Sequence, residues 1–97
     1  MLIWKPLALA DRNAILDYIA QDNPVAAVEM DERIEGCAEQ LINQPQLGRR
    51  GRVAGTRERV AHPSYLLIYE VDDAGYITVL RVLHTAQSWP QTRKRDE

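Results

Sequence analysis

Residues 56–84 read TRERVAHPSYLLIYEVDDAGYITVLRVLH and contain three strand-like runs. Two of them, residues 65–71 and 76–83, are rich in β-branched, aromatic and aliphatic residues, a composition typical of strands. The sequence Asp-Asp-Ala-Gly at residues 72–75 separates them. Its glycine can adopt a positive φ without steric cost, so it predicts a hairpin turn. Because neither run alternates cleanly between apolar and polar residues, we expect central strands that are covered at least in part on both faces.

The length and composition of the chain predict one domain. It has 97 residues, of which 45% are apolar and 27% are charged, as in an ordinary globular protein. We expect a single domain over residues 1–97, with a partly flexible tail at residues 85–97. No apolar run approaches the roughly 18 residues of a membrane span, and we expect no signal peptide. The single cysteine cannot form an internal disulfide, which suggests a reducing compartment, and we expect a cytoplasmic protein. One cysteine and two distant histidines give no metal-ligand spacing, so we expect no metal or cofactor.

Charge is divided unevenly along the chain, whose net charge is −2. Residues 1–45 hold eight acidic and three basic side chains, a balance of −5, and residues 46–97 hold nine basic and six acidic side chains, a balance of +3. Five of these bases fall within residues 49–59. Such polarity can mark a surface for an anionic partner. A solvated basic face without a partner is the alternative.

Two amphipathic helices are predicted ahead of the strands. A short apolar run at residues 2–4 leads to Pro6, which is typical of the first residue of a helix. The apolar positions of this helix are Leu7, Ala10, Ala14, Ile15, Tyr18 and Ile19. Asn23 is a suitable N-cap for a second helix, and Pro24 is a suitable first residue. The apolar stripe of the second helix consists of Ala27, Met30, Ile34, Cys37 and Leu41. We expect Ile34 and Leu41 to lie in the core.

The predicted order of elements is β-α-α-β-β-β, which defines an α+β fold. Two helices joined by about three residues should form an antiparallel hairpin. We expect this N-terminal hairpin to pack on one face of a small, mainly antiparallel sheet. Residues 45–52 are predicted to form a loop between the hairpin and the sheet. A chain of this length leaves the other face of the sheet partly open, and we expect the functional residues there.

Several short motifs follow one another along nearly the whole chain. They are Tyr18-Ile19-Ala20 with Asp22-Asn23-Pro24, Pro45-x-x-Gly48-Arg49, Tyr65-x-x-Ile68-Tyr69-x-Val71, and Arg81-Val82-Leu83-His84 with Trp89-Pro90. In this order and spacing they resemble a toxin of the RelE/ParE superfamily, the toxin half of bacterial type II toxin–antitoxin modules. The resemblance implies the RelE/ParE fold, a cytoplasmic toxin and neutralisation by a cognate antitoxin. It also allows a toxin–antitoxin hetero-oligomer, in which the antitoxin folds on binding.

The resemblance is closest to the ParE-like branch, whose members inhibit DNA gyrase by binding. RelE-like members cleave mRNA on the ribosome instead. In their strand pattern a phosphate-stabilising arginine falls at the position of Leu66. Their C-terminal basic and tyrosine residues fall at residues 85–87, which are Thr-Ala-Gln in this chain. These departures favour a gyrase inhibitor that is not an enzyme, and we assign it no catalytic residue.

A ribosome-dependent mRNA endonuclease is the alternative function. YafQ-like members also lack the strand arginine and rely on histidines and an aspartate, and an imidazole that titrates near neutral pH can act as base and as acid. For such a nuclease the catalytic residues would be His62, His84, Arg59 and Arg81. Each histidine also has a structural interpretation, His62 as a turn residue and His84 as the end of a strand. A non-toxic interaction module is a third interpretation.

Basic and aromatic side chains in the second half of the chain are the candidates for contact with the target or the antitoxin. They are Arg49, Arg50, Arg52, Arg57, Arg59, Arg81, His84 and Trp89. Arg57 and Arg59 flank Glu58, so they share one face of their strand. Arg81 lies in an apolar strand, where a guanidinium needs a partner. We expect it to form a salt bridge with Glu70 or Glu58.

Overall fold

The computed structural model describes residues 1–87 and Trp89. Its elements are β1 (Leu2–Trp4), α1 (Pro6–Ala20), α2 (Pro24–Asn43), β2 (Arg49–Arg50), β3 (Arg57–His62), β4 (Tyr65–Val71) and β5 (Ile77–His84). The predicted order and the α+β class are confirmed. One short strand is added, since β2 lies in the segment predicted to form a loop. Most of the tail predicted at residues 85–97 falls outside the described residues.

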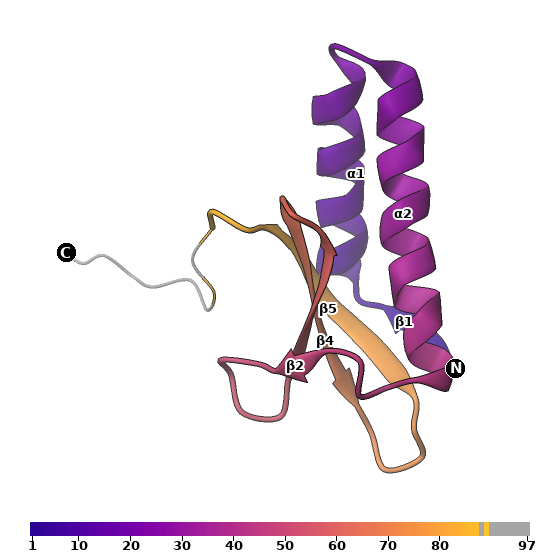
Figure 1. The fold of residues 1–97 in the computed structure, drawn as a ribbon, viewed down its shortest axis with the longest axis vertical. Coiled ribbons are helices and arrows are strands. Elements are labelled where there is room, and N and C mark those ends of the chain that lie inside the picture. The colour runs from indigo at the N-terminus through magenta and orange to yellow at the C-terminus, as the bar shows by residue number, and fades with distance from the viewer. Residues whose placement is uncertain (88, 90–97) are drawn as a thin grey trace, which may run out of the picture.

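The sheet has five strands in the order β1-β5-β4-β3-β2. β1 is parallel to β5 and every other neighbouring pair is antiparallel, so the prediction of a mainly antiparallel sheet is confirmed. Figure 1 shows α1 and α2 side by side, as a hairpin whose turn extends beyond the sheet. Among the described residues, neither helix is both long and apolar enough to cross a membrane.

Local sequence signals fix the ends of the elements. The helices begin at Pro6 and Pro24, as predicted. The side chain of Asn23 caps α2 by accepting a hydrogen bond of 3.0 Å from the N–H of Ala26. In the turn between β4 and β5, Gly75 has a φ of +86°, a conformation that other residues rarely adopt. The predicted hairpin is therefore confirmed together with its turn glycine.

An aliphatic core joins the helical hairpin to one face of the sheet. Ile34 and Leu41 of α2 are fully buried, as predicted. The stripe predicted for α1 is wrong in part, because Leu7 and Tyr18 are 61% and 70% exposed, whereas Ala8 is fully buried. Ala8 belongs to the same buried cluster as Ile34. Its small side chain allows α1 to approach α2 and β5 closely, and this close packing sets the rotation of the helix.

The face of the sheet away from the helices carries a smaller apolar cluster. It consists of Leu66, Ile68 and Leu83, with Leu80 and Trp89 packed against it. β4 is therefore covered on both faces, and its first five residues are all buried. This agrees with the non-alternating sequence of the strand. We call this side of the sheet the open face, because no helix covers it.

Candidate functional site

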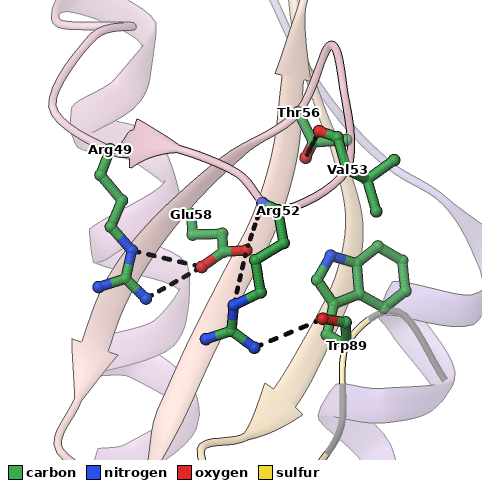
Figure 2. Close-up of polar contacts among 6 residues, drawn as sticks. All are labelled: Arg49, Arg52, Val53, Thr56, Glu58 and Trp89. Carbon is green, nitrogen blue, oxygen red and sulfur yellow. Dashed lines mark hydrogen bonds and ion pairs between the residues drawn. The ribbon is translucent and has the colours of Figure 1, made fainter. Parts of the chain in front are cut away.

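Glu58 is the buried acidic centre of the open face. It is 2% exposed, and Arg49 and Arg52 cover it from two sides (Figure 2). Nη2 and Nε of Arg49 donate to Oε1 of Glu58 at 3.0 and 3.3 Å. The main-chain N–H of Arg52 donates to Oε2 at 3.1 Å, and its guanidinium Nε lies 3.8 Å from the same oxygen. One carboxylate thus engages two of the candidate binding arginines.

Several influences act on the pKa of Glu58. Burial by itself raises this pKa, because desolvation disfavours the charged form. The hydrogen bonds from the main chain of Arg52 and from Arg49, and the charges of both guanidinium groups, act in the opposite direction. Together they hold the pKa of Glu58 below its usual value. A buried carboxylate that stays ionised needs its partners, so Arg49 and Arg52 have a structural role in addition to any binding role.

Trp89 lies beside these arginines on the open face. Nη1 of Arg52 donates to the main-chain oxygen of Trp89 at 3.4 Å (Figure 2). A pocket of about 240 Å³ is lined here by both Glu58-binding arginines, by His84 and by the apolar side chains of Leu66 and Leu83. Leu66, at which the resemblance predicts the strand arginine of RelE-like toxins, is 5% exposed and apolar. The open face therefore offers a shaped surface with an apolar floor and a basic rim.

Arg57 and Arg59 point to the other side of the sheet. Nη1 of Arg57 donates to the main-chain oxygen of Gly48 at 2.7 Å. Nη2 of Arg59 donates to Oε1 of Gln40 in α2 at 3.3 Å. The prediction that these two arginines share one strand face is confirmed, and that face is the helix-bearing one. The candidate binding residues are therefore distributed over two surfaces.

The partner predicted for Arg81 is wrong. Its guanidinium binds Asp11 of α1, with Nε–Oδ2 and Nη2–Oδ1 distances of 2.8 and 3.0 Å, and neither Glu70 nor Glu58 pairs with it. The hydrogen bond with Asp11 raises the pKa of Arg81. Oδ2 of Asp11 also accepts a 2.8 Å hydrogen bond from the N–H of Val82. Beyond the end of β1 the outer edge of β5 faces α1, and this carboxylate takes the place of a neighbouring strand there.

His62 and His84 lie on either side of the Tyr65 ring. The ring centroids are 6.1 Å apart for His62 and Tyr65 and 5.5 Å apart for Tyr65 and His84. Nδ1 of each histidine accepts a main-chain hydrogen bond, from Ser64 at 3.0 Å and from Ala86 at 3.1 Å. A neutral imidazole with an accepting Nδ1 carries its proton on Nε2. In this tautomer each ring can donate a hydrogen bond through Nε2. Its Nδ1 is already occupied by a main-chain N–H and cannot accept another hydrogen bond.

These two histidines line a pocket of about 560 Å³ between α1 and the ends of β4 and β5. Asp11, which sequence reasoning missed, and Tyr18 also line it. Arg59 and Arg81 do not line it, so the four residues considered for nuclease chemistry are not gathered at one point. Within residues 1–87 and Trp89, no group of histidine, cysteine, aspartate and glutamate side chains could hold a metal ion.

Known proteins resemble this chain in both sequence and structure. A family model described as the ParE toxin of type II toxin–antitoxin systems matches residues 2–89. The chain belongs to this ParE toxin family. Toxin RelE2 of Caulobacter vibrioides is 40% identical over 86 residues, which cover 89% of this chain and 96% of the relative. The chromosomal ParDE system of P. aeruginosa superposes with a TM-score of 0.73 and 25% identity over 86% of this chain and 92% of the other.

Membership of the ParE toxin family confirms the resemblance to RelE/ParE toxins. The fold extends further, because the toxin–antitoxin complex RelBE2 of Mycobacterium tuberculosis shares it at a TM-score of 0.61 and 21% identity, over 87% of this chain and 95% of the other. In this ParE-family toxin the side chains form two separate basic surfaces. Glu58 lies at the centre of one, and the edge between β2 and β3 on the helix-bearing face forms the other.

Proposed function

We propose that this ParE-family toxin inhibits DNA gyrase by binding and does not cleave RNA. The observation that carries the proposal is the hydrogen bonding of His62 and His84, since Nδ1 of each is occupied by a main-chain N–H. Cleavage through a 2′-hydroxyl needs a group that removes a proton, a group that stabilises the charged phosphorane and a group that protonates the leaving oxygen. With Nδ1 occupied in this way, either ring would have to give up a main-chain hydrogen bond before it could remove the first proton.

The positive charges that could stabilise a phosphorane are also engaged elsewhere. Arg81 is held by Asp11 and Arg59 contacts α2. Leu66 offers no charge on the open face. A gyrase inhibitor does not need these groups, because it acts through a shaped surface. The pocket that His84 and Trp89 line on the open face is the surface to which we assign target binding.

The proposal includes a cognate antitoxin as partner. The solved structures with this fold include a ParDE system and the RelBE2 toxin–antitoxin complex, which supports a hetero-oligomer for this chain. Three apolar side chains near the turn of the helical hairpin, those of Tyr18, Val25 and Val28, are 70%, 68% and 52% exposed. Such a surface suits a segment that is disordered when free and folds on binding. Gyrase and antitoxin are both cytoplasmic, and we place the toxin there.

An assay with purified toxin tests the gyrase target. The toxin should inhibit supercoiling of relaxed plasmid by DNA gyrase, while mRNA in a translating extract stays intact. Toxin premixed with the antitoxin encoded beside its gene is the control and should leave supercoiling unaffected. Expression without antitoxin should induce a DNA-damage response and filamentation. Codon-positioned mRNA cleavage that is lost in His84→Ala would contradict the proposal and support a ribosome-dependent nuclease.

A further inference from the structure

Two arginines face each other across the β2–β3 pair without a carboxylate between them. Arg50 lies directly opposite Arg57 in the strand register. Like charges directly opposite in an antiparallel pair destabilise a sheet. On the other face of the same pair, Arg49 lies opposite Glu58 and binds it. Within residues 1–87 and Trp89, neither Arg50 nor Arg57 forms a salt bridge. At this edge of the sheet the charge of Arg49 is neutralised by Glu58, whereas the Arg50–Arg57 pair has no neutralising charge among the residues that the structure describes. We call it the uncompensated pair.

The uncompensated pair forms one wall of a pocket of about 550 Å³. The remaining walls come from the loop between β2 and β3 and from the end of β4, and the lining contains no acidic residue: Gly51, Arg52, Val53, Ala54, Gly55, Thr56 and Val71. The guanidinium of Arg52 is directed to Glu58 on the open face (Figure 2). Arg57 donates one hydrogen bond, to Gly48, and its guanidinium has further donors. The charge of this pocket therefore comes from Arg50 and Arg57.

The lining favours a peptide over a nucleic acid. A guanidinium fork binds a carboxylate or a phosphate equally well in geometry. Proteins that bind single-stranded nucleic acids combine a basic groove along the backbone with aromatic side chains on which the bases stack, and no aromatic residue lines this pocket. The lining instead provides the aliphatic side chains of Val53 and Val71. A long polyanion would also be repelled by α2, whose side chains Glu29, Glu32, Glu35 and Glu39 are exposed.

We propose that the Arg50–Arg57 pocket binds an acidic segment of a protein partner. Carboxylates of the segment lie on the two guanidinium groups, and an aliphatic side chain of the segment packs against Val53 and Val71. The bound carboxylates supply the negative charge that the β2–β3 pair lacks on this face. That the partner is the antitoxin rests on the proposed function. The recognition of an acidic peptide rests on the pocket alone.

A titration of ¹⁵N-labelled full-length protein tests this site. The ligand is a short peptide that alternates glutamate and valine. Amide shifts should be concentrated at residues 50–57 and at Val71. Arg50→Ala should weaken binding about tenfold, the change expected when a charge-assisted hydrogen bond is lost. Lys5→Ala removes the same charge from an exposed position at the other end of the sheet and should leave the affinity unchanged.

Three results would overturn the proposal. The first is an equal affinity of wild type and Arg50→Ala for the peptide, and the second is shifts that lie outside residues 50–57 and 71. The third is tighter binding of a single-stranded oligothymidylate of similar length than of the acidic peptide. Melting temperatures check that each variant is folded, and Arg57→Gln provides a second variant in the same pocket. Gyrase inhibition is measured separately, so failure of the proposed function leaves the peptide result intact.

Discussion

Arg49 and Arg50 are adjacent in sequence but face opposite sides of β2. Arg49→Ala removes a charge-assisted hydrogen bond from the buried carboxylate of Glu58, so we expect the free energy of unfolding to fall by about 1–3 kcal/mol. Arg50→Ala removes an exposed side chain, and we expect a change of less than about 0.5 kcal/mol. Urea denaturation of both variants measures the difference. Equal losses would show that Glu58 does not depend on Arg49.

Glu58 should also make the stability of the protein sensitive to acid. Its pKa is lower in the folded protein than its ordinary value, so the unfolded chain takes up a proton first as the pH falls. The resulting stabilisation is present at neutral pH and is lost as the pH falls from about 4.3, the usual pKa of glutamate, through the lower folded pKa. Glu58→Gln should lack this part of the acid sensitivity. Urea denaturation at a series of pH values compares the two proteins, and a stability difference that is constant with pH would argue against this role.

The sequence predicted the strand face of a charged side chain better than it predicted the partner of one. The shared face of Arg57 and Arg59 follows from the two-residue period of a strand and needs no knowledge of the fold. The partner of Arg81 is different, because Asp11 is 70 positions away and belongs to a helix. β1 ends at Trp4, so the edge of β5 beyond this point has no neighbouring strand within the described part of the chain and is open to that helix. Strand lengths of this kind depend on tertiary packing and are not readable from local composition.

Ile34 and Ile42 provide a matched test of how α2 is oriented. Ile34 is fully buried between the hairpin and the sheet, whereas Ile42 is 42% exposed on the same helix. Ile34→Ala should destabilise the protein by roughly 2–5 kcal/mol, because it leaves a cavity in the core. Ile42→Ala should cost less, since it removes less buried apolar surface. Thermal unfolding of both variants measures this difference. Similar melting temperatures for the two would show that the stripe does not face the sheet.

Helix ends and the order of elements could be predicted because local chemistry specifies them. Asn23 occupies the cap position that its side chain favours, and Gly75, which has no Cβ, occupies the turn position that requires a positive φ. The rotation of α1 could not be predicted, because the small side chain of Ala8 and the larger one of Leu7 both fit a helical stripe. β2 was missed because its two residues are arginines, which have no strand preference. Its register with β3 places Arg49 opposite the buried Glu58, and this long-range pairing is not visible in the local sequence.

The whole molecule combines an acidic helical hairpin with a basic sheet edge. The balance of −5 over residues 1–45 and +3 over residues 46–97 corresponds to β1 with the hairpin and to the rest of the chain. A uniform polyanion would be attracted by one part and repelled by the other. A protein partner can present basic side chains to the acidic hairpin and acidic side chains to the basic part of the chain. The charge distribution of the fold therefore agrees with action through protein contacts.

His62→Ala separates the two mechanisms. Loss of a general acid or base typically lowers a reaction rate by about 10²–10⁴-fold, so a nuclease that relies on His62 would lose its toxicity. A gyrase inhibitor would lose the hydrogen bond between Ser64 and the ring, the contact of the ring with Tyr65 and part of one pocket wall. We therefore expect His62→Ala to inhibit growth as strongly as wild type when it is expressed without antitoxin. Colony counts after induction measure this, and the melting temperature shows whether the variant is folded. Action by binding alone would be excluded if wild type cleaves mRNA and the folded His62→Ala protein neither cleaves mRNA nor inhibits growth.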